Sequence, residues 1–189
     1  MKAGFFLALF AALQLNCLGD DTNQLFFGGW SQNVNGLRSR FVVSIEHENE
    51  RRCAAVYLEL QNVSDAAPIE FNSGFSLKCQ LTNTTGTAFP SSVCNVDHFI
   101  PRPYWIDIPY GSTLKLRVDD AWATVAGFKG QTGVSMVVGS GFWLIPDKTT
   151  NEYFLTGVFQ VQPAFGTMDH EHPWNGTIQP PQVKIYFHK

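Results

Sequence analysis

Residues 54–61 read Ala-Ala-Val-Tyr-Leu-Glu-Leu-Gln, and their side chains alternate in character. Val56, Leu58 and Leu60 fall on one side of an extended chain, and Tyr57 with two polar residues falls on the other. This alternation is typical of a strand that protein covers on one face only. We therefore expect Ala54–Gln61 to be a strand of an antiparallel sheet.

The same period of two recurs along the chain, in short β-branched and aromatic runs. The one helical candidate, Asp120 to Ala126, spans two turns at most. Many short strands predict a sandwich or a barrel. The other runs that we expect to be strands are Leu37–Ile45, Ile69–Phe71, Phe75–Leu81, Trp105–Ile108, Thr113–Val118, Val134–Val138, Phe142–Ile145, Tyr153–Gln160 and Val183–Phe187.

Turn residues separate these runs. Side-chain oxygens of Asn, Asp and Ser bond to a reversing backbone, and glycine adopts the conformations that turns need. The turns that we expect are Asn62–Asp65, Asn83–Gly86, Pro109–Gly111 and Pro146-Asp147. The glycine-rich segment Gly127–Gly141 is predicted to be an insertion loop or a flexible hairpin.

The composition indicates a single globular domain. The chain has 189 residues, of which 44% are hydrophobic and 15% are charged, and its formal net charge is −3. Because no block of Lys or Arg occurs, the phosphate-neutralising contacts on which nucleic-acid binding depends are missing. We therefore expect no nucleic-acid partner.

The N-terminal residues predict an export signal. Residues 3–15 form an apolar run behind the positive charge of Lys2, and this run is shorter than the ~20 residues that a membrane-spanning helix needs. Cys17 and Gly19 supply small residues for cleavage before Asp20. A lipid anchor at Cys17 is the alternative, which the residues before it do not favour. We expect a signal peptide at 1–19, a lead-in at 20–36 and a β-sandwich domain at 37–189, exported to the periplasm, the cell surface or the medium without a membrane span.

Three segments of the chain carry a family resemblance. They read WSQNVNGLRSRF at 30–41, LELQNVSD at 58–65 and WNGTIQPPQVKI at 174–185. Together with the turn at 109–112 and the run at 153–159, they resemble uncharacterised exported domains of planctomycete bacteria. The resemblance implies an immunoglobulin-like antiparallel β-sandwich and carries no activity. The unit at 58–65 is also similar to bacterial proteinase-inhibitor-like sandwich domains.

The densest polar cluster reads MDHEH at residues 168–172. In an extended segment, His170 and His172 point the same way, an arrangement that suits zinc or copper. The cluster lies between a glycine and a proline, however, which favours a solvated loop. We therefore expect no cofactor, and a metal site at His170 and His172 is the alternative.

Catalytic signatures are weak in this sequence. Ser135 and Ser140 lie outside a Gly-x-Ser-x-Gly elbow. The segment 127–133 lacks the Gly-Lys-Ser/Thr ending of a phosphate loop, and the adjacent Asp119 and Asp120 would diverge on a strand. We therefore expect a protein that is not an enzyme.

The five tryptophans raise the alternative of carbohydrate binding. Trp143 lies in an apolar run, and Trp30 and Trp174 flank strand ends, where rings fill a core or its open edges. Trp105 and Trp122 are expected to be more exposed.

Three sequons occur, at Asn62, Asn83 and Asn175. They are glycosylation sites in a eukaryote and plain turn residues in a bacterium, and the planctomycete resemblance favours the second interpretation.

The cysteines predict one disulfide. With Cys17 removed, Cys53, Cys79 and Cys94 remain. Cys79 and Cys94 flank the turn at 83–86 almost symmetrically, so a chain that doubles back there can bring them into bonding range. We expect a Cys79–Cys94 bridge with a buried Cys53 thiol, against the alternative of three reduced core cysteines.

These observations predict a non-catalytic exported β-sandwich that acts as a binding or structural module at the cell envelope. Its partner would be an envelope or extracellular protein or a glycan. Two alternatives remain. One is a small ligand binder, for metal through His170 and His172 or for carbohydrate through exposed Trp, and the other is an inhibitor of secreted proteases.

Overall fold

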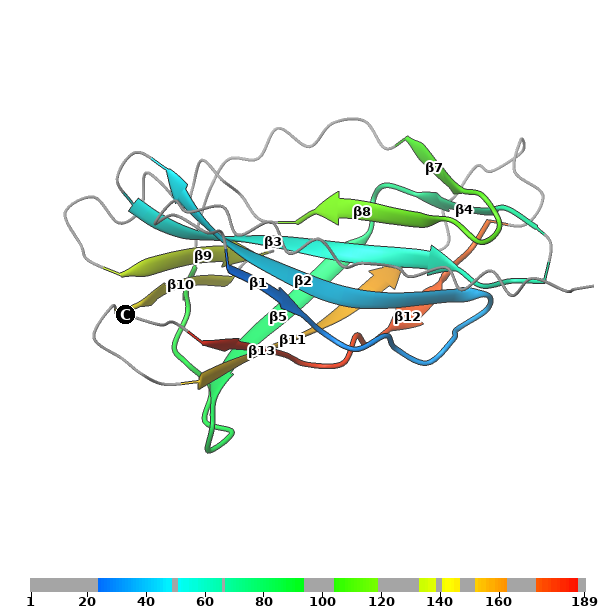
Figure 1. Cartoon of the computed structure of the whole chain (residues 1–189). Coiled ribbons are helices and arrows are strands. Elements are labelled where there is room, and N and C mark those ends of the chain that lie inside the picture. Colours follow the sequence, from blue (N-terminus) through cyan, green and yellow to red (C-terminus); the bar gives the residue numbers. More distant parts are fainter. Residues whose placement is uncertain are drawn as a thin grey trace, which may run out of the picture.

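The computed structural model describes residues 24–48, 51–65, 67–93, 104–118, 133–138, 141–146, 152–162 and 173–186. Within these ranges the chain forms strands and their connections, and no helix (Figure 1). The strands lie in several sheets, and every described strand pair but one is antiparallel. The protein is therefore all-β, as the alternating pattern predicts.

The larger sheet is organised around a long strand, β3. Its strands, in order of neighbours, are β1 (Gln24–Phe27), β2 (Leu37–Glu48), β3 (Arg51–Asn62), β9 (Val134–Val138), β10 (Gly141–Ile145) and β6 (Ser92–Val93), and β8 (Thr113–Arg117) also pairs with β3. β2 pairs with β3 along its whole length. On the other edge of β3, β8 pairs with the C-terminal half and β9 with the N-terminal end.

The smaller sheet is organised in the same way around β11. Its strands are β5 (Ser76–Asn83), β11 (Glu152–Val161), β12 (Gly176–Ile178) and β13 (Val183–Tyr186). β5 pairs with β11 along one edge, and β13 and β12 share the other edge in tandem. A separate pair is formed by β4 (Ile69–Asn72) and β7 (Trp105–Ile108).

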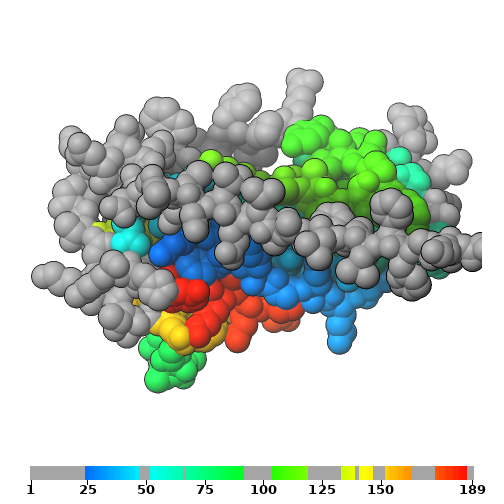
Figure 2. Space-filling view, in the orientation of Figure 1, coloured from blue at the N-terminus to red at the C-terminus, as the bar shows by residue number. Residues whose placement is uncertain are grey.

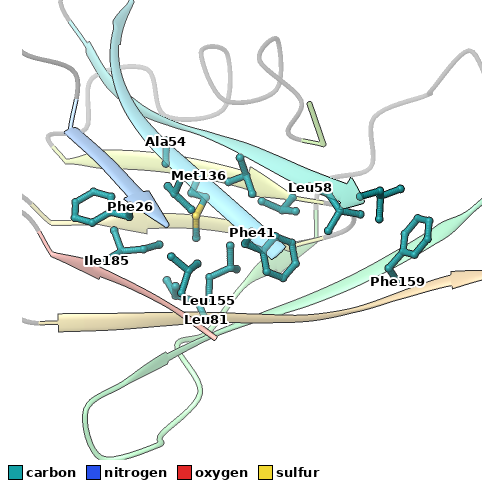
Figure 3. Packing of buried hydrophobic residues seen from close by; sticks show 14 of the residues in the cluster. Phe26, Phe41, Ala54, Leu58, Leu81, Met136, Leu155, Phe159 and Ile185 are labelled. Atoms are coloured by element: carbon teal, nitrogen blue, oxygen red, sulfur yellow. The ribbon is translucent and has the colours of Figure 1, made fainter. Parts of the chain in front are cut away.

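The two larger sheets face each other across a hydrophobic cluster. In Figure 3, Phe41 and Leu58 of one sheet point toward Leu155 of the other. Alternate residues of each strand supply these side chains, as the pleat requires. Val56, Leu58 and Leu60 are fully buried, which confirms the face predicted from the sequence.

The two ends of the described chain lie side by side. In Figure 2 the blue N-terminal strands adjoin the red C-terminal segment. The ring of Phe26 on β1 meets the ring of Tyr186 on β13 edge-on, with 5.0 Å between the centroids. This contact links one edge of the larger sheet to the smaller sheet.

All ten strands expected from the sequence are present, with bounds that differ by up to three residues. The strands β1, β6 and β12 were not predicted. β6 and β12 have two and three residues, too few to show a period. β1 has four residues, Gln24–Phe27, and lies ahead of the first alternating run that the sequence shows. β1 lies inside the segment 20–36, the predicted lead-in to the sandwich domain. The expected helix at 120–126 lies outside the described residues.

The pairing of β9 with β3 is parallel, and it corrects the expectation of a purely antiparallel sheet. β8 already occupies half of this edge of β3, and residues 118–133 separate it from β9. A connection of that length allows the chain to enter from the far end, as parallel pairing requires. All five residues of β9 are buried, four of them apolar and the fifth Ser135, as expected of a strand that is covered on both faces.

The two sheets are in close contact where Phe41 packs on Gly157. A Cβ atom at position 157 would lie 2.7 Å from Cζ of Phe41 and 3.0 Å from Sγ of Cys79. Only glycine leaves room for the Phe41 ring on the inner face of β11. The fully buried Phe41 therefore depends on the absence of a side chain on the opposite strand.

We expect Gly157→Ala to destabilise the protein by about 1–3 kcal/mol, because the added methyl group overpacks this contact. Urea unfolding measures the change. Gly29→Ala is the matched control, since its Cβ would find its nearest neighbours at 3.9 Å. Adding Phe41→Leu to Gly157→Ala should recover part of the loss, and a Gly157→Ala variant as stable as the parent protein would contradict this account.

Candidate functional site

The solvent-facing side of the larger sheet carries a ladder of charged and aromatic side chains. They are outward residues of β2, β3 and β8, which alternate with the core residues of the same strands. Val42, Ser44 and Ala55 on the same side of β2 and β3 are buried and do not belong to the set. The segment before β2 adds one ring to them. We call this set the charged aromatic face: Trp30, Arg38, Arg40, Glu46, Tyr57, Glu59, Gln61, Lys115 and Arg117.

Strand register aligns the polar groups of this face in rows. Arg40 lies opposite Glu59, and its Nε donates to Oε2 of Glu59 at 2.7 Å. One row along, Nε of Arg38 donates to Oε1 of Gln61, also at 2.7 Å. These cross-strand bonds hold both guanidinium groups at fixed positions above the sheet.

Trp30 lies against both arginines. The guanidinium carbon is 4.9 Å from the Trp30 ring centroid for Arg38 and 4.5 Å for Arg40. The exposed ring of Phe27 lies 5.3 Å from the same carbon of Arg40. Cations at this distance from a ring are attracted to its negative face. Trp30 is therefore a half-buried ring on the outer face and not part of the described core cluster.

A second ring, that of Tyr57, contacts the cations of β8 on the same face. Nζ of Lys115 lies 4.1 Å from its centroid, and the guanidinium carbon of Arg117 lies 6.0 Å away. The Tyr57 hydroxyl donates to Oε1 of Glu46 at 3.3 Å, and Arg117 pairs with the same carboxylate at 3.5 Å. The face thus combines four cations with two carboxylates in a chain whose net charge is negative.

The sequence could have indicated this face. Arg38 and Arg40 share one side of a strand, as do Lys115 and Arg117, and both pairs lie opposite residues that the alternation of β3 directs away from the core. The sequence does not show which strands are neighbours, so the rows became visible only in the structure.

The remaining tryptophans lie elsewhere. Trp143 and Trp174 are buried, as predicted, and their Nε1 atoms donate to the carbonyl oxygens of Phe89 and Val34. Trp105 is half-buried, and Trp122 lies outside the described residues.

His170 and His172 lie outside the described residues, so the metal alternative stays a prediction. Within the described part of the chain, no group of three or more His, Cys, Asp or Glu side chains is arranged to hold a metal ion.

The described cysteines lie on opposite sheets. Cys53 is buried in β3, and its Sγ lies 3.7 Å from the carbonyl oxygen of Glu46. Cys79 on β5 is a free thiol in this structure, and burial raises its pKa to about 12. Cys94 lies outside the described residues, so the Cys79–Cys94 bridge stays a prediction.

The three sequon asparagines differ in their surroundings. Asn62 is fully buried, and its Nδ2 donates to the carbonyl oxygens of Ala67 and Ile108 at 2.8 and 2.9 Å. Its Oδ1 accepts bonds from the N–H and the hydroxyl of Ser64. This side chain therefore has a structural role, and the folded protein leaves no room for a glycan on it. Asn83 stabilises a turn at the surface, and Asn175 is exposed.

A pocket of about 450 Å³ lies at a different place, between residues 31–34 and the connection from β12 to β13. Its lining contains amides, hydroxyls, prolines and aliphatic side chains, and no ionisable side chain. It shares no residue with the charged aromatic face.

Comparisons with known proteins give no match for this chain, whether to a family model, a curated protein or a solved structure. Among the described residues there is no helix with the length and apolar character needed to cross a membrane.

We expect Asn62→Ala to lower the free energy of unfolding by about 2–4 kcal/mol, because it removes four side-chain hydrogen bonds at a buried position, including the buried bond to the carbonyl of Ile108. Asn83→Ala is the control. It removes an equivalent turn asparagine whose partners are exposed, and it should cost about 1 kcal/mol. Equal losses in chemical denaturation would show that the burial of Asn62 contributes nothing.

The Cys79 thiol should make the stability of the reduced protein fall at alkaline pH. Its folded-state pKa is raised, so above about pH 9 the unfolded chain loses this proton while the folded chain keeps it. The free energy of unfolding then falls by up to about 1.4 kcal/mol per pH unit until pH approaches the folded-state value. Denaturation series from pH 8 to 11 should show this slope, and Cys79→Ala should remove that part of it. Identical slopes in the two proteins would contradict the prediction.

Proposed function

We propose that this chain is a non-catalytic exported module of immunoglobulin-like sandwich type that binds an acidic glycan through the charged aromatic face. One observation carries the proposal. Arg38 and Arg40 lie against Trp30 on the same solvent-facing sheet where Lys115 and Arg117 lie against Tyr57.

The chemistry of these groups matches such a ligand. Guanidinium groups recognise carboxylate and sulfate oxygens through paired hydrogen bonds. The face of an aromatic ring is an apolar surface on which the C–H groups of a sugar ring can pack. Lys115 and Arg117 are exposed, and Trp30 and Tyr57 are half-buried, so both kinds of group are accessible from solvent.

The rigidity of the face favours binding. The ion pair of Arg40 with Glu59 and the bond from Arg38 to Gln61 hold these long side chains in place before a ligand arrives. A ligand therefore meets ordered groups, and less side-chain entropy is lost on binding. Side chains repeat along a strand at about 6.8 Å and across strands at about 4.8 Å, a regular array suited to a polymer with repeated charges.

Two parts of this proposal, the export of the protein and its immunoglobulin-like architecture, rest on the sequence. The apolar run at 3–15 supports export, and the resemblance to exported planctomycete domains supports the immunoglobulin-like arrangement. Two sheets that face each other across a common core are compatible with that arrangement. At an envelope, acidic polysaccharides are available partners.

The purified protein should bind polygalacturonate and dextran sulfate, and binding should weaken as salt rises, because bound counterions are released. Lys115→Glu/Arg117→Glu should weaken binding at least about tenfold, a loss of about 1.4 kcal/mol or more. Biolayer interferometry measures the affinities, and neutral dextran is the ligand control.

The variant control is Lys78→Glu/Lys184→Glu, which changes the net charge equally on exposed residues of the smaller sheet. It should change the affinity less than about twofold, or by less than 0.5 kcal/mol. An equal loss in both variants would mean that net charge alone attracts the polymer. Equally tight binding of single-stranded DNA would mean the same, and either result would overturn the proposal.

A further inference from the structure

The edge of β11 that faces β12 and β13 is interrupted in its middle. β13 pairs with residues 152–155 and β12 with residues 159–161. Between them, residues 156–158 face the connection Gln179–Gln182. In the described chain no backbone hydrogen bond joins these two segments.

Two prolines explain this break. Pro180 and Pro181 occupy the connection, and proline has no N–H to donate to a neighbouring strand. The regular sheet ladder therefore stops at this segment, between the pairs Leu155–Val183 and Phe159–Ile178.

The backbone of Gly157 faces the break. On β5, Leu81 accepts a bond from the N–H of Phe89, so its backbone groups point away from β11. Leu81 lies opposite Leu155, and this pair is therefore not hydrogen-bonded to each other. Bonded and non-bonded pairs alternate along two antiparallel strands, so the pair of Gly157, two residues further on, is also non-bonded. Gly157 therefore directs its N–H and C=O toward the connection.

The pocket of about 450 Å³ lies at this break, within the roughly 300–1,000 Å³ of small-molecule sites. Its lining has three side-chain amides, two hydroxyls and four apolar residues. The residues are Ser31, Gln32, Val34, Thr156, Ile178, Gln179, Pro180, Pro181 and Gln182.

The wall opposite the connection is held firmly. The N–H of Ser31 donates to the carbonyl of Ser39 at 2.8 Å, and the Ser39 N–H donates back to Oγ of Ser31 at 3.0 Å. Val34 is fixed by backbone bonds with Leu37 in both directions and by Nε1 of Trp174, which donates to its carbonyl at 3.1 Å. The pocket is therefore formed before any ligand binds.

From this geometry we infer that the pocket binds one uncharged sugar residue. Each sugar hydroxyl both donates and accepts a hydrogen bond, and a primary amide offers both functions in one group. Gln32, Gln179 and Gln182 are exposed at the rim, and their amides make no hydrogen bond to the described protein. The prolines, with Val34 and Ile178, supply apolar surface for the C–H groups of the ring.

The absence of charge in the lining selects against ionic ligands. Burial of a charged group without an opposite charge is costly, and the nine lining residues include no ionisable side chain. This site differs in location and chemistry from the charged aromatic face, so it does not depend on the proposed function.

Saturation-transfer NMR and calorimetry with the methyl glycosides of glucose, galactose, mannose and N-acetylglucosamine test the inference. At least one glycoside should bind with a Kd of roughly a millimolar. Gln179→Ala/Gln182→Ala should weaken that binding at least about fivefold. Gln160→Ala/Gln162→Ala, with amides outside the pocket, should leave it unchanged, and thermal melting should show that both variants are folded.

Three results would overturn the inference. They are no binding by any glycoside up to about 20 mM, undiminished binding in the Gln179→Ala/Gln182→Ala variant, and tighter binding of glucuronate than of the methyl glucoside. The variant Lys115→Glu/Arg117→Glu should still bind the glycoside. Its loss of acidic-polymer binding thus reports on the charged aromatic face alone.

Discussion

The hydrogen bonds of Asn62 hold together the parts of the chain on which the charged aromatic face depends. Its side chain bonds to the carbonyl oxygens of Ala67 and Ile108, and its backbone bonds to Gly111 and Ser112 in the turn that begins β8. One buried residue thus fixes the end of β3, the connection to β4 and the start of β8. A buried polar group is tolerated only when its bonding capacity is met, and here four side-chain bonds meet it.

The same position explains why β8 presents its cations where it does. The turn at Pro109–Ser112 sets the register of β8 against β3, so Lys115 lies opposite Glu59 and Arg117 opposite Tyr57. A slip of one residue would turn both cations toward the core and expose Leu114 and Leu116. Packing of the inner face therefore controls the pattern of charge on the outer face.

Of the two proposed binding surfaces, one lies on a regular part of a sheet and the other at an interruption. The charged aromatic face lies where the ladder is complete and the outer side chains form straight rows. The pocket lies where the ladder fails, because Pro180 and Pro181 cannot donate to β11. The aligned side chains of the charged aromatic face suit an extended charged polymer, and the pocket at the interrupted strand edge suits a single sugar residue.

By itself, the sequence determined the class of fold, ten of the described strands and the core-facing sides of β3, β8 and β13, because the pleat makes alternation a local property. It also indicated the turn at Asn62, though not the burial of that residue. The tertiary structure alone decided which strands are neighbours, that β9 runs parallel to β3, and that Trp30 meets two arginines on the outer face. Pairing joins residues far apart in the chain, and its choice depends on the packing of the whole core, which no local pattern records.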